Sequence, residues 1–195
     1  MALAGWLFAL GSAAAVCILA TLLATTVGDV RFWPPGETAW KARLHWGLVT
    51  VFNIALVGTA VLDWNSWVLP RPTSLVIGVG LALVGAVVFG YSVRVMDAEE
   101  TSGGNPETLY TDGPYARSRN PQYVGMIIGI TGFALLVNAP SVAGLAILHI
   151  FWVVLLPFAE EPWLREQFGE EYDRYRERVP RFIGFRTFRP AASSN

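Results

Sequence analysis

The stretch YVGMIIGITGFALLV-NAP-SVAGLAILHIFWVVLLPF, residues 123–158, contains no Asp, Glu, Lys or Arg. It divides at Asn138-Ala139-Pro140, a tripeptide typical of turns, into apolar runs at 123–137 and 141–158. Two apolar runs joined by so short a turn predict a tight helical hairpin within a membrane. The first arm is shorter than the roughly 20 residues that cross a bilayer, so we expect it to tilt or to be covered by its neighbours.

Three more apolar runs precede the hairpin, at Leu3–Val27, Leu48–Leu62 and Ser74–Val93. The whole chain is 53% hydrophobic and 15% charged, whereas soluble domains carry about 25% charged residues. The first run is too long, and its start too poor in basic residues, for a signal peptide. We therefore expect an all-α fold, a polytopic membrane helical bundle of about five transmembrane helices that includes the C-terminal hairpin.

The distribution of basic residues predicts how the bundle is oriented. With five crossings, all but one of the 14 Lys and Arg residues fall on the same side, and the exception is Arg71. Because basic loops stay in the cytoplasm, we expect the C-terminus inside the cell and the N-terminus outside. Trp33, Trp40 and Trp46 then fit an interfacial belt on the cytoplasmic side, an interpretation that we prefer to ligand stacking.

A further helix is predicted in the tail. Glu160-Glu161-Pro162 has the composition of a helix start, with acids and a proline in the first turn. Apolar residues then recur at helical spacing, which predicts a cytoplasmic amphipathic helix that ends before Pro180. These residues are Leu164, Phe168, Tyr172, Tyr175 and Val179.

Several functions are disfavoured by what the sequence lacks. The net charge of −1 gives no basic field for nucleic acid, so we expect no nucleic-acid partner. The single cysteine, Cys17, excludes an intrachain disulfide and a cysteine-based metal site. His45 and His149 are too few and too far apart to suggest a metal site, so no metal ligands are assigned. His149 lies inside the last span, where it is either a functional group or a neutral imidazole bonded between helices.

Two features carry the polar chemistry. The first is the loop at 112–125, DGPYARSRNPQYVG, which enters the hairpin; the second is the acidic pair Glu160-Glu161 at the end of the last span. The hairpin brings both to the same membrane face. A cation, carboxylates, an amide and tyrosine rings there suit a small zwitterionic ligand, since tyrosine faces attract a sulfonium. The alternative is an ion pair that merely fixes the loop to the helix.

This arrangement resembles the C-terminal signature of the isoprenylcysteine carboxyl methyltransferase family and its phospholipid methyltransferase relatives. The resemblance covers roughly residues 110–183. The matching residues are Gly113-Pro114-Tyr115, Arg119-Asn120-Pro121, Tyr123, Gly125, Glu160-Glu161, Phe168-Gly169-Glu170-Glu171-Tyr172, Tyr175 and Val179-Pro180.

The resemblance implies that S-adenosylmethionine binds, as methyl donor, between the hairpin and the tail, and that an acceptor enters from the lipid. It assigns Arg119 and Glu161 as catalytic residues. The implied cofactor-binding set, to which His149 is added as the intramembrane candidate, is Tyr115, Arg119, Asn120, Tyr123, Gly125, His149, Glu160 and Glu161.

Two positions depart from the family pattern. Asn120 stands where many members have His, so that position cannot titrate here. Eukaryotic carboxyl methyltransferases carry basic residues just before the acidic pair, whereas Ile150–Phe158 has no charge. The second departure does not favour a prenylcysteine carboxylate as the acceptor.

The sequence therefore predicts an integral membrane methyltransferase that transfers a methyl group from S-adenosylmethionine to a prenylcysteine-like carboxylate, a thiol or a lipid. Residues 1–95 would form three N-terminal transmembrane helices, and residues 96–195 the catalytic region. A non-catalytic membrane protein that binds lipid or a partner with the same fold is the alternative, and a small transporter is the least favoured. Composition favours a bacterial inner membrane. The acceptor and the oligomeric state stay open.

Overall fold

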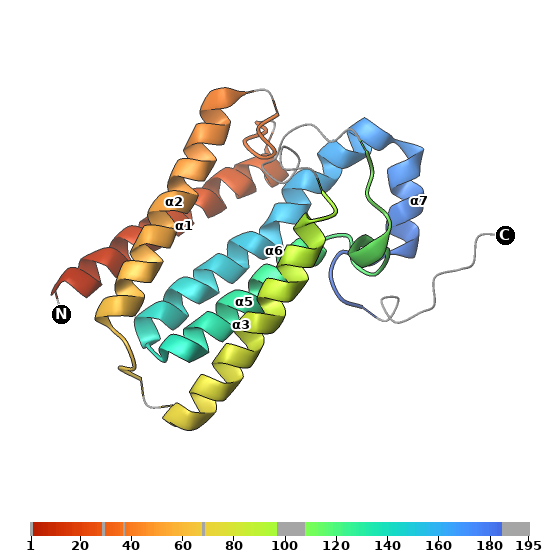
Figure 1. Ribbon diagram of the computed structural model, residues 1–195. Helices are drawn as coiled ribbons and strands as arrows, with labels where there is room; N and C mark the ends of the chain where they lie inside the picture. Colours follow the sequence, from red (N-terminus) through yellow and green to blue (C-terminus); the bar gives the residue numbers. More distant parts are fainter. Residues whose placement is uncertain (1, 29, 37, 68, 97–107, 185–195) are drawn as a thin grey trace.

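The structure is a computed structural model that describes residues 2–28, 30–36, 38–67, 69–96 and 108–184, and every regular element in these ranges is helical (Figure 1). The all-α fold expected from the sequence is confirmed. The elements are α1 (Ala2–Val27), α2 (Ala39–Leu62), α3 (Arg71–Val93), the short 3-10 helix η1 (Gly113–Ala116), α5 (Pro121–Val137), α6 (Pro140–Phe168) and α7 (Glu170–Arg178).

Four helices, α1, α2, α3 and α6, are long and apolar enough to cross a membrane. The fifth expected span is α5, which has 17 residues and extends about 26 Å, slightly less than the roughly 30 Å hydrocarbon layer. It is the short arm of the hairpin. α3 packs along one side of α5 and α6 along another, as expected for an arm covered by its neighbours. The protein is a polytopic helical membrane bundle.

The hairpin turn forms where the sequence predicted it. Asn138 takes the left-handed conformation (φ 56°, ψ 53°), a conformation that commonly ends helices, and α6 begins two residues later at Pro140. The Asn138 amide donates to Asn65 Oδ1 at 2.9 Å and to Leu69 O at 3.2 Å. The turn is thus tied to the connection between α2 and α3 at the same end of the bundle.

Glycines let α3 and α5 pack backbone against backbone. A Cβ at Gly85 would lie 2.3 Å from Gly129 N, and one at Gly132 would lie 2.3 Å from Ala82 N. A Cβ at Gly125 would lie 2.5 Å from Phe89 N. Small residues at this spacing are the usual means of close helix packing in lipid, where the hydrophobic effect does not drive helices together.

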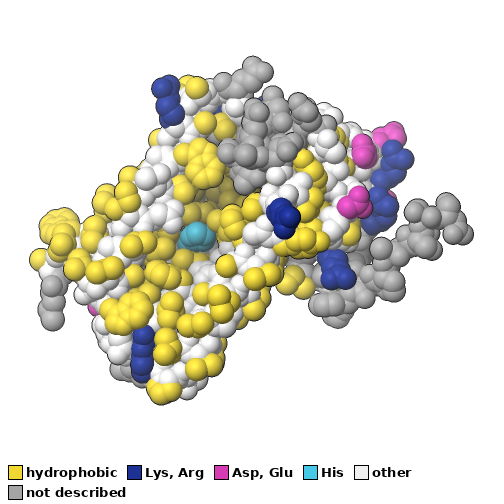
Figure 2. Space-filling model, in the orientation of Figure 1, with side chains coloured by type: hydrophobic (Ala, Val, Ile, Leu, Met, Phe, Trp, Pro, Cys, Tyr) yellow, Lys and Arg dark blue, Asp and Glu magenta, His cyan; other side chains and the backbone are white. Residues whose placement is uncertain are grey.

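α6 is the central helix of the bundle and packs against α1, α2, α5 and α7. Its fully buried Leu145 and Val153 belong to one core with Ile18 of α1 and Phe52 of α2. On the face of the molecule drawn in Figure 2, apolar side chains cover most of the bundle, and the acidic and basic side chains are most dense around α7. This surface is the one expected of helices that face lipid.

The tail differs from the prediction. No helix starts at Glu160, because α6 continues through Pro157 and Pro162 to Phe168. The break comes at Gly169, whose φ of 53° and ψ of −125° suit glycine alone, and α7 follows. The predicted apolar face is nevertheless present, since Leu164 and Phe168 of α6 pack with Tyr172, Tyr175 and Val179 in one cluster. Gly169 folds that face onto itself.

Candidate functional site

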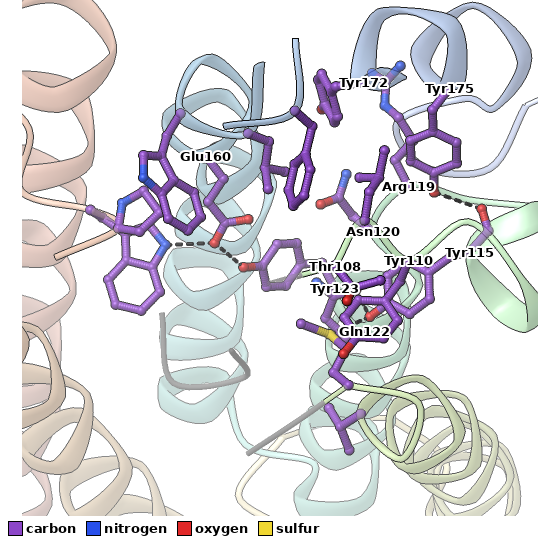
Figure 3. A pocket seen from close by; sticks show the side chains of 18 of the residues that line it. Thr108, Tyr110, Tyr115, Arg119, Asn120, Gln122, Tyr123, Glu160, Tyr172 and Tyr175 are labelled. Carbon is purple, nitrogen blue, oxygen red and sulfur yellow. Dashed lines mark hydrogen bonds between the residues drawn. The ribbon is translucent and has the colours of Figure 1, made fainter. Parts of the chain in front are cut away.

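A cavity of about 150 Å³ opens at the end of the bundle that carries α7. Its walls come from the ends of α3 and α6, the start of α5, the segment 108–115, α7, and Trp33 and Pro34 from the connection between α1 and α2. The lining is mainly apolar and aromatic and includes five tyrosines, namely Tyr110, Tyr115, Tyr123, Tyr172 and Tyr175 (Figure 3).

Tyr115 is placed by η1 and braced on two sides. Its hydroxyl lies 2.7 Å from Met96 Sδ and 3.2 Å from Gln122 Oε1. Its carbonyl accepts a hydrogen bond from the Tyr175 hydroxyl at 2.7 Å, which connects α7 to the loop before α5 (Figure 3). The loop and the tail therefore form one continuous wall of the cavity.

Glu160 is the carboxylate of the cavity wall. Its Oε1 accepts hydrogen bonds from the Tyr123 hydroxyl at 2.5 Å and from Trp33 Nε1 at 2.6 Å. Tyr123 is in the first turn of α5, and Trp33 lies on the other side of Glu160. The carboxylate is thus clamped between the hairpin and the connection from α1 to α2.

Glu161, the other acid of the pair, points toward the tail and pairs with two arginines. Its Oε1 lies 2.8 Å from Arg119 Nη2, and its Oε2 lies 2.7 Å from Arg181 Nη2. The side chains of Arg119 and Glu161 are 8% and 9% exposed, so this is a largely buried ion pair. The hydrogen bonds that the Arg181 guanidinium donates to Glu161 raise the pKa of Arg181, which therefore stays charged.

The tail is held over the hairpin by further bonds from the same loop. Arg119 Nη1 donates to the carbonyls of Arg176 and Val179 at 3.1 and 3.2 Å, and Arg119 N donates to Pro180 O at 2.9 Å. The Asn120 amide donates to Arg181 O at 3.0 Å. The ion pair offered above as an alternative to a ligand site is therefore real, and it lies directly beside the cavity.

The predicted site residues divide into those that line the cavity and those that do not. Five line it, namely Tyr115, Arg119, Asn120, Tyr123 and Glu160. Glu161 lies behind Arg119. Gly125 faces α3, where it makes the close approach to Phe89.

His149 of α6 lies in the core of the bundle, where α6 packs against α2. Its ring stacks on the Trp152 ring with the centroids 4.6 Å apart, and its centroid lies 5.7 Å from that of the Phe52 ring. Neither ring nitrogen has a hydrogen-bond partner among the described residues. The interhelical bond considered for this histidine is not formed there.

Two residues that the sequence placed on the apolar face of the tail helix are part of the cavity wall. Tyr172 and Tyr175 are 1% and 3% exposed and both line the cavity. Burial raises the pKa of both phenols, so they stay neutral over the physiological range. They offer uncharged aromatic faces to a ligand.

The sequence did not reveal every wall residue. Trp33, expected in an interfacial belt, is 5% exposed and lines the cavity, whereas Trp40 and Trp46 are 52% and 41% exposed. Gln122 was inside the quoted loop but was not singled out. Within the described ranges, no group of three or more His, Cys, Asp or Glu side chains could hold a metal ion.

The chain is similar to a family of membrane methyltransferases. The family model described as phospholipid methyltransferase matches residues 73–171, from α3 to the start of α7. Protein-S-isoprenylcysteine O-methyltransferase B of Arabidopsis thaliana is 32% identical over 79 residues, which cover 40% of this chain and 40% of that protein. The resemblance stated from the motifs is confirmed.

Two bacterial relatives align over a longer stretch. The cobalt-zinc-cadmium resistance protein CzcN of Cupriavidus metallidurans is 32% identical over 71% of this chain. The nickel-cobalt-cadmium resistance protein NccN of Alcaligenes xylosoxydans is 31% identical over 70%. The chain spans 61% of the length of each of these relatives. No solved structure matches the chain significantly. Because the family match covers about half of the chain and includes the loop, the hairpin and the acidic pair, the protein belongs to the phospholipid methyltransferase family.

Proposed function

We propose that this protein is an S-adenosylmethionine-dependent methyltransferase that acts on a lipophilic acceptor in the membrane. The observation that carries the proposal is the cavity itself. It is walled by tyrosines, contains the Glu160 carboxylate and lies at one end of a lipid-facing bundle in a chain of a methyltransferase family.

The residues present fit the donor. Its sulfonium and ammonium groups need negative or aromatic surfaces, and the tyrosine faces of the lining supply the aromatic ones. Its carboxylate needs a cation, and Arg119 lines the cavity with a buried Nε that has no partner among the described residues. The donor supplies an electrophilic methyl group, so the chain's task is to align donor and acceptor and to exclude water.

The assigned residues then fall into two roles. We propose that Tyr115, Tyr123, Asn120 and Glu160 contact the donor or the reacting atoms. Arg119 would bind the donor and, with Glu161, hold the tail over the cavity. Residues 96–195 would supply most of the chemistry, with residues 1–95 as support and with Trp33 as a contribution from that first part.

The test is transfer of a tritiated methyl group from S-adenosylmethionine into a bacterial lipid extract by the purified protein in lipid vesicles. We expect labelled lipid with the wild type and with Glu166→Ala, which breaks only the exposed pair between Arg31 and Glu166. We expect none with Glu161→Ala. Donor binding without any transfer, across lipid, thiol and amine acceptors, would support the non-catalytic alternative instead.

A further inference from the structure

Only one oxygen of Glu160 is used by the protein. Oε1 accepts both hydrogen bonds, from Tyr123 and Trp33, while Oε2 has no hydrogen-bond partner among the described residues. The carboxylate faces the cavity (Figure 3). One oxygen is thus anchored, and the other is available to a molecule in the cavity.

Trp33 is held in place by contacts with both α1 and α2. Its indole stacks on His45 of α2, with ring centroids 4.0 Å apart and an angle of 28°. The hydroxyl of Thr25 in α1 accepts hydrogen bonds from the backbone N–H groups of Phe32 at 2.9 Å and Trp33 at 3.4 Å. Both α1 and α2 therefore fix the indole N–H that meets Glu160. Trp33 lies outside the residues 73–171 that match the family model.

The Arg119 guanidinium beside the cavity is largely engaged, and only its Nε is left, for the donor carboxylate. Arg119 pairs with Glu161 and donates to two carbonyls of the tail. Arg119 is the one Lys, Arg or His among the described lining residues. A second carboxylate placed beside Glu160 would therefore meet a like charge in an apolar cavity, which is unfavourable.

We propose that Glu160 accepts the proton of the methyl acceptor and that Trp33 is the positioning residue that orients it. The proposal rests on the proposed function. A lone pair of the acceptor atom forms the new bond to the methyl carbon, and the carbon–sulfur bond breaks with its electron pair going to sulfur. The proton on the acceptor atom passes to Glu160 Oε2. Oε1 keeps both hydrogen bonds throughout, because a protonated carboxyl still accepts at its carbonyl oxygen.

This role defines the class of acceptor. Its nucleophilic atom carries a proton, as in a thiol, a phenol or an amine, on a lipophilic body that enters from the bundle side. A carboxylate has no proton to give and is repelled by Glu160. The absence of charge in Ile150–Phe158 likewise does not favour a prenylcysteine carboxylate as the acceptor.

The experiment compares four acceptors with apolar tails, namely dodecanethiol, dodecylamine, para-nonylphenol and dodecanoate. The protein is assayed in vesicles as wild type, Glu160→Gln, Trp33→Phe and Trp40→Phe. The last variant is the matched control, since Trp40 is exposed on α2 and does not line the cavity. Equilibrium binding of S-adenosylmethionine is measured first for each protein, so that failure of the donor site is seen separately.

We expect transfer to at least one of the three proton-bearing acceptors and none to dodecanoate. Glu160→Gln should bind the donor within threefold of wild type and lose at least a hundredfold in kcat. Trp33→Phe, which keeps a ring against His45 but loses the N–H, should lose about tenfold in kcat with KM for the donor unchanged. Trp40→Phe should match the wild type.

Three results would overturn the proposal. They are transfer to dodecanoate alone, loss of donor binding in Glu160→Gln, and full turnover by Glu160→Gln. If the wild type itself does not bind the donor, the proposed function has failed and this inference fails with it. A rise in KM together with a fall in kcat for Trp33→Phe, with a lower melting temperature, would reduce Trp33 to a structural residue.

Discussion

Glu161 lies between two arginines that belong to segments far apart in the chain. It pairs with Arg119 at the entrance to α5 and with Arg181 after α7. Glu161→Ala leaves Arg119 buried without its carboxylate, so we expect a loss of about 3 kcal/mol in the free energy of unfolding. Thermal unfolding in detergent measures this loss, and donor binding should fall with it because the tail is released.

The matched control is another glutamate of the same helix. Glu166 pairs with Arg31, but both side chains are exposed, so Glu166→Ala should change the free energy of unfolding by less than about 1 kcal/mol. If both variants lose stability equally, the buried pair has no special role.

His149 is buried in the bundle with neither ring nitrogen paired among the described residues. An unpaired buried polar group costs roughly 1–3 kcal/mol, so His149→Leu should raise the melting temperature. The variant should bind S-adenosylmethionine normally, because His149 does not line the cavity. A measured loss of donor binding would restore the cofactor-binding role expected from its place in the span.

The sequence predicted which residue types line the cavity better than it predicted which way each side chain points. Four lining residues could be found because they stand in short motifs at the two ends of one hairpin, namely Arg119, Asn120, Tyr123 and Glu160. Trp33 could not, because 127 positions separate it from Glu160 and nothing in its neighbours predicts the contact.

Among the helices, the pair α3 and α5 depends on glycine. At Gly85 an added Cβ would lie 2.3 Å from a backbone atom of α5, whereas Gly80 of the same helix has nothing within 4 Å. Gly85→Ala should therefore destabilise the protein by roughly 1–3 kcal/mol through overpacking.

Gly80→Ala is the control and should be neutral or slightly stabilising, since alanine favours helix by up to about 1 kcal/mol over glycine. Circular dichroism during heating measures both variants. Equal melting temperatures would mean that the close approach of α3 and α5 is not maintained in the membrane.

Among the helix boundaries, the sequence predicted the hairpin turn correctly and the start of the tail helix wrongly. Hydropathy and the turn at Asn138 predicted the hairpin, because both are local. Pro162 was taken as a helix start, but α6 passes through it and ends only where Gly169 takes a conformation with positive φ. Proline fits both a first turn and the interior of a helix whose packing compensates for the lost bond, and sequence alone does not separate the two.

Across the whole molecule, charge is placed asymmetrically. Arg71 lies at the end of the bundle with the hairpin turn, where it donates to Leu136 O, while Arg119 of the loop and Arg181 of the tail pair with Glu161 at the end that carries the cavity. The positive-inside rule then predicts that the cavity opens to the cytoplasm. A reporter fused after Asn195 should be active only in its cytoplasmic form, and activity in the periplasmic form alone would reverse this orientation.

The central claim is that the cavity beside Glu160 is the donor site, and equilibrium binding of S-adenosylmethionine to the purified protein tests it most directly. Val93→Trp places an indole in the cavity wall. Val87→Trp places one on the outer face of the same helix, at a residue that is 69% exposed. We expect the wild type and Val87→Trp to bind equally, and Val93→Trp to bind at least tenfold more weakly. Equal binding by all three folded proteins would place the donor elsewhere, and no binding by the wild type in detergent and in lipid would contradict the methyltransferase assignment.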